Sequence, residues 1–195
     1  MSHTTTPPFL AHTLWESDNT LLRNTVLAVA GTVVLWISAK LNIPFYPVPM
    51  TMQTFAVLTI GMAFGWRLGG ATILLYLLEG ALGLPVFAGT PERGVGLAYM
   101  VGPTGGYLVG FLVSAVVVGW LAERGWDRKF LSTLAAMTIG TAIIFALGAG
   151  WLGTILGWDK PIMEMGVTPF MLGAVFKIAL AAAVLPSIWR YLSRV

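Results

Sequence analysis

Residues 168–185 read TPFMLGAVFKIALAAAVL, a stretch long and apolar enough to cross a membrane, and a single cation, Lys177, interrupts it. A charge inside hydrocarbon is costly, so such a residue is either paired within the protein or holds a polar ligand. Only one acidic residue, Glu79, lies in a comparably apolar run. Much of the function therefore depends on what these two side chains face.

The composition of the whole chain indicates an integral membrane protein. Of its 195 residues, 57% are hydrophobic and only 10% are charged, whereas soluble domains carry about 25% charged residues. Long continuous apolar runs predict helical spans and exclude a β-barrel. The basic residues are scattered and form no stripe, which argues against nucleic-acid binding.

The chain lacks the residues that several kinds of chemistry require. It has no cysteine, and its two histidines, His3 and His12, lie in the polar N-terminal residues. We therefore expect no metal site in the membrane and no cofactor. Neither a nucleotide-binding motif nor a catalytic nucleophile motif appears, so we expect no enzyme, no catalytic residues and no direct use of ATP.

Six apolar segments, each near the ~20 residues that a span needs, predict an all-α integral membrane protein with six transmembrane helices. They are residues 22–41, 52–66, 68–87, 105–122, 130–156 and 168–192. Residues 1–21 are expected to form a polar cytoplasmic tail, and residues 22–195 the transmembrane domain. The second segment is short enough to be tilted or partly re-entrant.

The distribution of Lys and Arg predicts the orientation, because cytoplasmic loops are enriched in both. With six spans, one side of the membrane carries Arg23, Arg67, Arg124, Arg128, Lys129, Arg190 and Arg194. The other side carries Lys40, Arg93 and Lys160. Both termini are therefore predicted to be cytoplasmic.

The predicted outer half of the bundle collects the polar groups of the membrane domain. By helical rise, Glu79 and Lys177 lie about 12 and 13 Å from the outer ends of their helices. The outer loops add Thr51, Gln53 and aromatic residues. Irregular backbone at a membrane is tolerated where it lines a cavity, so these residues predict a ligand site. Two alternatives stay open: Lys177 and Glu79 form a structural ion pair, or Thr51 and Gln53 only cap a helix.

Four motifs in order resemble the BioY biotin transporters, the substrate-capture components of energy-coupling factor vitamin importers. They are VPMTMQ at residues 48–53, GALGLPVFAG at 80–89, GPTGGY at 102–107, and Pro169-Phe170 followed by Lys177. The resemblance implies six helices and a biotin site on the outer side. It also implies a transmembrane coupling subunit and ATPase subunits as partners, although some members are thought to transport alone.

Two departures from the family pattern concern the site. The family often has an acidic residue three positions before the lysine, where this chain has Ala174. Its outer loop often reads Gly-Gly-Asn-Gly, where this chain carries Glu92 and Arg93. Glu92 and Glu79 are the candidates for the missing carboxylate. The predicted substrate-binding residues are Lys177, Thr51, Gln53, Phe45, Glu79, Phe87, Glu92, Arg93 and Tyr107.

We interpret the chain as a multi-pass protein of the bacterial cytoplasmic membrane that captures biotin for import. Biotin is the transported substrate, membrane lipid surrounds the domain, and glycine pairs spaced by four leave a homo-oligomer open. Lys177 is expected to serve the carboxylate or the ureido carbonyl of biotin. Residues 89–101 are expected to close over the bound ligand. The alternatives are a membrane enzyme acting on lipid head groups and an assembly protein without a small-molecule substrate.

Overall fold

The structure is a computed structural model that describes residues 10, 19–43, 46–88 and 95–192. Its helices are α2 (Thr20–Lys40), α3 (Gln53–Ala81), α4 (Leu97–Met100), α5 (Gly105–Ala122), α6 (Phe130–Leu156), α7 (Ile162–Gly166) and α8 (Thr168–Leu192). Two short strands, β1 (Asn42–Ile43) and β2 (Met50–Thr51), join α2 to α3. Within the described ranges, 5 helices are long and apolar enough to cross a membrane: α2, α3, α5, α6 and α8.

Helix α3 folds back on itself at Gly65. The backbone there has φ 74° and ψ 174°, a conformation outside the helical region that glycine adopts without a steric penalty. A Cβ added to Gly69 would lie 3.0 Å from the Cα of Gly61. In a continuous helix, residues eight apart are separated by about 12 Å along the axis. The two halves of α3 are therefore antiparallel neighbours, and they correspond to the predicted segments 52–66 and 68–87.

The reversal in α3 is held by the end of α5. Gly119 lies so close that a Cβ there would meet the carbonyl carbon of Gly65 at 2.6 Å. The Glu123 carboxylate accepts a hydrogen bond from the backbone N–H of Trp66 at 3.3 Å. This N–H opens the second half of α3, where a helix has unpaired donors and favours negative charge. Small residues and one carboxylate thus stabilise the sharp turn.

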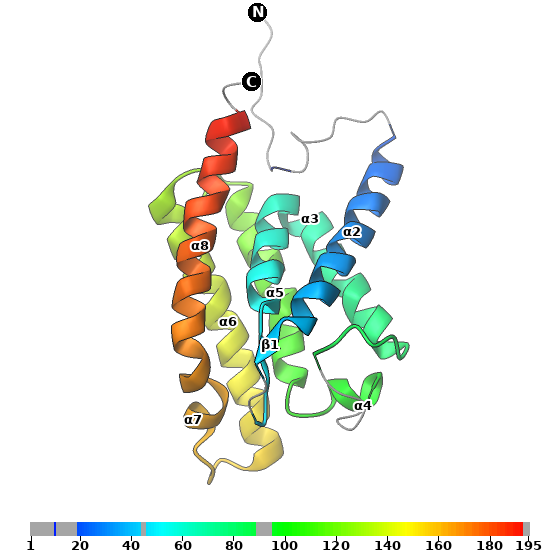
Figure 1. Cartoon of the computed structure of the whole chain (residues 1–195), viewed down its shortest axis with the longest axis vertical. Coiled ribbons are helices and arrows are strands. Elements are labelled where there is room, and N and C mark those ends of the chain that lie inside the picture. Colours follow the sequence, from blue (N-terminus) through cyan, green and yellow to red (C-terminus); the bar gives the residue numbers. More distant parts are fainter. Residues whose placement is uncertain (1–9, 11–18, 44–45, 89–94, 193–195) are drawn as a thin grey trace, which may run out of the picture.

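The long helices form a bundle with α5 near its middle (Figure 1). α5 packs against α3 and α6, α2 packs on α3, and α8 packs on α6. The first residues of α2 and the last residues of α8 lie at the same end of the bundle (Figure 1). Strands β1 and β2 pair antiparallel, with Asn42 opposite Thr51, and extend toward the opposite end below α2.

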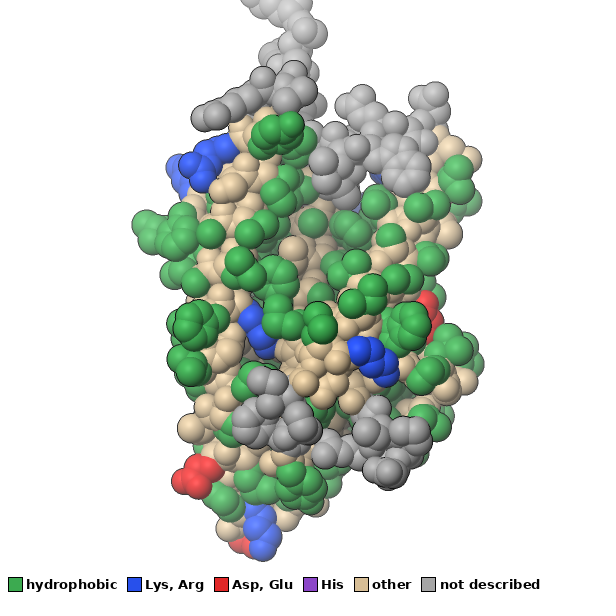
Figure 2. All heavy atoms as spheres, viewed as in Figure 1, with side chains coloured by type: hydrophobic (Ala, Val, Ile, Leu, Met, Phe, Trp, Pro, Cys, Tyr) green, Lys and Arg blue, Asp and Glu red, His purple; other side chains and the backbone are tan. Residues whose placement is uncertain are grey.

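Hydrophobic side chains cover much of the face seen in Figure 2. Large apolar residues stay exposed along the outer helices, for example Val29 at 50% and Leu172 at 71%. Such a surface suits the acyl chains of a bilayer rather than water. The chain is therefore a multi-pass, all-helical membrane protein apart from its two-residue strands.

The helix boundaries follow the sequence prediction closely for α5, α6 and α8, whose bounds coincide with the predicted segments. Two features differ. The predicted segment 68–87 ends as a helix at Ala81, because turns follow it and Gly83 has a φ of 92°. The loop before Gln53, predicted as irregular, contains the β1–β2 pair.

Candidate functional site

A cavity lies between the first half of α3, the start of α5, the middle of α6 and the first half of α8. Its remaining wall comes from residues 48–51 on β2 and the loop before it, with Ala88 and Tyr99. Three helices present residues spaced by four to this cavity: Tyr107 and Phe111; Met137, Thr141 and Phe145; and Phe170, Ala174 and Ile178. This spacing places each set on one helix face.

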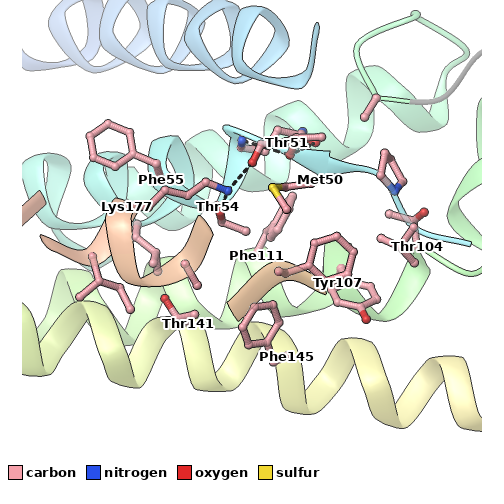
Figure 3. Close-up of a pocket in the computed structure, with 18 of the residues that line it drawn as sticks. Met50, Thr51, Thr54, Phe55, Thr104, Tyr107, Phe111, Thr141, Phe145 and Lys177 are labelled. Carbon is pink, nitrogen blue, oxygen red and sulfur yellow. Dashed lines mark hydrogen bonds between the residues drawn. The ribbon is translucent and has the colours of Figure 1, made fainter. Parts of the chain in front are cut away.

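Lys177 is the cation of this cavity. Its half-buried ammonium donates to the backbone oxygen of Thr51 at 2.6 Å and to the Thr54 hydroxyl at 3.1 Å. Figure 3 shows the side chain reaching from α8 toward β2 and the start of α3, with Met50 and Phe111 beyond it. Both of its partners are uncharged. Within the described residues, the ammonium is therefore solvated by polar groups and not neutralised by a carboxylate, which leaves its positive charge available to an anionic or strongly polar ligand.

The ion pair considered for Lys177 and Glu79 does not form. Both residues are described, and the ion pair recorded within the described ranges joins Lys160 to Asp159 at 3.2 Å. Glu79 is half-buried in the second half of α3 and is not among the residues that line the cavity. The charge of Lys177 therefore has another role than pairing with Glu79.

A chain of hydrogen bonds positions the polar wall beside Lys177. The backbone N–H of Gln53 donates to the Thr51 hydroxyl at 3.2 Å, so Thr51 does cap the start of α3. The Gln53 amide also donates to the Tyr76 hydroxyl at 2.6 Å, and Tyr76 donates to the backbone oxygen of Val86 at 2.8 Å. This chain links the cavity wall, both halves of α3 and the segment that follows α3.

Aromatic rings form much of the remaining wall. Phe111, Phe145 and Tyr107 surround one end of the cavity in Figure 3. The hydroxyl of Tyr107 donates to the Gly166 backbone oxygen at 2.6 Å, so this residue offers its ring rather than its polar group. Tyr99 lines another part of the cavity and stacks on Phe87 with the ring centroids 5.1 Å apart. The wall suits a flat, partly apolar ligand.

The structure brings together four of the nine predicted site residues at the cavity: Lys177, Thr51, Gln53 and Tyr107. Phe87 packs behind Tyr99 and also meets Tyr76 edge to face at 5.5 Å. Glu79 lies away from the lining, as described above. Phe45, Glu92 and Arg93 lie outside the described residues.

Sequence reasoning missed three threonines of the cavity. Thr54 binds Lys177, while Thr104 and Thr141 line the wall. Within the described part of the chain, the hydroxyls of Thr104 and Thr141 have no hydrogen-bond partner, so they can bind a ligand. For Thr141, the spacing by four from Met137 and Phe145 was the available signal, but α6 is apolar on nearly every face, so no stripe stands out.

The comparisons with known proteins agree on one family. The family model described as "BioY family" matches residues 8–194. "Biotin transporter BioY" of Thermotoga maritima is 36% identical over 163 residues, covering 84% of this chain and 94% of that protein. "Biotin transporter BioY" of Rhizobium etli is 36% identical over 165 residues, covering 81% of this chain and 87% of that protein.

A solved structure has the same fold. It is described as the S-component for biotin from an ECF-type ABC transporter. It superposes with a TM-score of 0.72 at 21% identity and covers 90% of this chain and 95% of that chain. The arrangement of helices around the cavity is thus one already seen in a membrane protein.

Proposed function

The chain belongs to the BioY family, and on that premise we propose that it captures biotin at the outer side of the membrane for import. It is a transporter component and not an enzyme, and biotin is its substrate rather than a cofactor. The nearby relatives reported above carry the name biotin transporter over most of their length. The identity of the substrate rests on these relatives.

One observation of this chain carries the proposal: Lys177 lies in a largely apolar, aromatic cavity and has no acidic partner among the described residues. Biotin matches this pattern, because it joins a polar ureido ring and a carboxylate through apolar parts. We assign Lys177, Thr51, Thr54 and Gln53 to its polar groups. The rings of Tyr107, Phe111 and Phe145 are assigned to its apolar parts. Lys177 serves either the carboxylate or the ureido oxygen.

We further propose six membrane crossings with both termini in the cytoplasm, residues 22–195 forming the transmembrane domain and residues 1–21 the tail. The reversal of α3 at Gly65 supports this count, because each half of α3 becomes one crossing. The Lys and Arg distribution supports the orientation. A bacterial cytoplasmic membrane is the proposed location.

The partner subunits are also proposals, which rest on the sequence and on the shared fold. The chain has no nucleotide-binding motif of its own, so import against a gradient needs an energy source from elsewhere. An ECF transmembrane coupling subunit with ATPase subunits supplies it, in keeping with the fold shared with an ECF-type S-component.

The predicted residues away from the cavity lining remain part of the proposal. Glu92 and Arg93 stand in a segment expected to cover bound biotin, and Phe45 in the loop between β1 and β2. Phe87 supports Tyr99 from behind. Glu79 does not pair with Lys177 and does not line the cavity, so Glu92 is the remaining candidate for the carboxylate that replaces the family's acidic residue.

The experiment is thermal unfolding of the purified protein in lipid nanodiscs with and without ligand. Biotin binding to the native state raises the melting temperature as its concentration exceeds Kd. Thiamine and riboflavin at the same concentrations serve as controls. A rise with biotin alone supports the proposal. A similar rise with all three vitamins, or none with biotin, overturns it.

A further inference from the structure

Lys40, the last residue of α2, binds a part of the chain that lies 47 residues further on. Its ammonium donates to the backbone oxygen of Phe87 at 3.0 Å. Lys40 has no carboxylate partner among the described residues, and it is not among the residues that line the biotin cavity. The contact therefore ties the end of α2 to the segment that follows α3, and it does so through a backbone carbonyl.

Residues 86–88, called here the wall segment, are part of the cavity. Ala88 lines the cavity directly. Phe87 stacks on Tyr99, which also lines it, with ring centroids 5.1 Å apart and planes at 18°. The Phe87 ring also packs over Gly80, where an added Cβ would overlap the ring. A displacement of Phe87 would therefore carry two lining residues, Ala88 and Tyr99, away from the ligand space.

Two side chains hold successive carbonyls of the wall segment. The Tyr76 hydroxyl donates to the backbone oxygen of Val86 at 2.8 Å, and Lys40 donates to that of Phe87 at 3.0 Å. Within the described ranges, no backbone N–H bonds the Phe87 oxygen. A carbonyl without a partner is costly when it is shielded from water. The Tyr76 bond joins the wall segment to α3, and the Lys40 bond joins it to α2.

The end of α2 is also bound to another wall of the cavity. Residue Asn42, which follows α2 closely, pairs with Thr51 in the β1–β2 ladder. Thr51 lines the cavity, and its backbone oxygen accepts from Lys177. In Figure 1, β1 continues directly from the last turn of α2. The end of α2 thus joins the wall that holds Lys177 to the wall segment, and Lys40 makes the second of these two connections.

We propose that Lys40 is a positioning residue of the biotin site. It holds the wall segment and the Tyr99 ring against the cavity, and it thereby slows the release of bound ligand. This inference rests on the proposed function, which supplies biotin as the ligand. A cation in the last turn of a helix also favours the helix dipole. That effect alone would stabilise α2 and leave the release of ligand unchanged.

The test compares three variants with the parent protein in lipid nanodiscs. Lys40→Met keeps an unbranched stem and removes the ammonium, whereas Lys40→Arg keeps a charged donor. Lys160→Met is the control, because it removes an equal charge whose side chain is 56% exposed. Three quantities are measured: the rate constants for binding and release of radiolabelled biotin, the melting temperature, and the hydrogen exchange of residues 84–88 and 97–101 without biotin.

We expect Lys40→Met to release biotin roughly tenfold faster, which is the effect of one lost charge-assisted hydrogen bond. Association should change little, because variants of one binding site differ mainly in dissociation. Hydrogen exchange of both segments should rise in Lys40→Met even without biotin. Lys40→Arg should return the release rate and the exchange toward the parent values, and Lys160→Met should leave both unchanged.

A lower melting temperature of Lys40→Met with unchanged release and exchange would assign Lys40 to the stability of α2 alone and overturn the proposal. Equal changes in Lys160→Met would show an effect of net charge and also overturn it. The exchange measurement needs no ligand, so it tests the hold of Lys40 on the wall segment separately from the substrate. A parent protein that binds no biotin would instead overturn the proposed function.

Discussion

Gln53 and Tyr76 share a hydrogen bond of 2.6 Å although 23 residues separate them within one helical element. A straight helix would place them about 35 Å apart. The bond exists because α3 reverses at Gly65, and it joins a residue of the cavity wall to a fully buried tyrosine on the returning half. The reversal thus shapes the site, and it underlies the proposed count of six crossings.

The reversal predicts the accessibility of single cysteines, which the native chain lacks. Leu82→Cys replaces a residue that is 85% exposed after the second half of α3 and should react with an impermeant maleimide from outside. Arg67→Cys and Gly125→Cys should react only after permeabilisation. Labelling of Arg67→Cys from outside, or of neither Arg67→Cys nor Gly125→Cys, would contradict six crossings in this orientation.

Tyr76→Phe should lower both stability and biotin affinity. The change removes the hydroxyl that joins Gln53 to the Val86 backbone oxygen and leaves two buried partners unsatisfied. Such a loss costs about 1–3 kcal/mol of unfolding free energy for each stranded group. Calorimetry for biotin and thermal unfolding measure the two effects. Thr138→Val, at an exposed threonine of α6, removes a hydroxyl elsewhere and is the control. A Tyr76→Phe protein as stable as the control would refute this role.

The fold was largely predictable, because long apolar runs bounded by Pro, Gly and charged residues have few alternatives in a bilayer. In the sequence, the reversal at Gly65 showed only as an unusually short apolar segment, residues 52–66. The reversal itself depends on packing against Gly119 and Glu123, which the sequence does not show. Lys177 stood out because a cation in hydrocarbon is rare. Thr104, just before α5, and Thr141, within α6, did not stand out, because a threonine in or beside a membrane helix commonly bonds the backbone of that helix. Only tertiary structure separates these two from Thr138, which does so.

Ala174→Phe should abolish biotin binding without unfolding the protein. Ala174 lines the cavity one turn before Lys177, so a larger side chain there fills the space for a ligand. Its half-buried position limits strain in the rest of the bundle. Val175→Phe is the matched control, because Val175 is 57% exposed on the same helix. Isothermal titration with biotin measures the difference. Binding by Ala174→Phe equal to that of the control would place the ligand elsewhere.

Asp127→Asn should change how stability depends on pH. Burial raises the pKa of the Asp127 carboxyl above its ordinary 3.8, so folding favours the protonated form. Stability is then lost as the pH rises from the unfolded pKa through the raised folded pKa. Asparagine is never charged, and it keeps an oxygen that can accept from Trp189. The melting temperature of Asp127→Asn, compared with that of the parent protein at the same pH, should therefore become more favourable as the pH is raised from acid to neutral. A difference in melting temperature between Asp127→Asn and the parent protein that shrinks as the pH rises would mean that the folded pKa of Asp127 is not raised.

Lys177→Met gives the sharpest test of the site. Methionine keeps an unbranched apolar stem but removes the ammonium that binds Thr51 and Thr54. Loss of a charge-assisted hydrogen bond to biotin costs roughly 1.5–3 kcal/mol, which is a ten- to hundredfold loss of affinity. Because Lys177 has no carboxylate partner in the described structure, its removal strands no buried charge, and the melting temperature without biotin should stay the same or rise. Lys160→Met is the control, since it removes an equal charge whose side chain is 56% exposed. Unchanged affinity together with a lowered melting temperature would make Lys177 a structural residue and remove the basis of the proposed site.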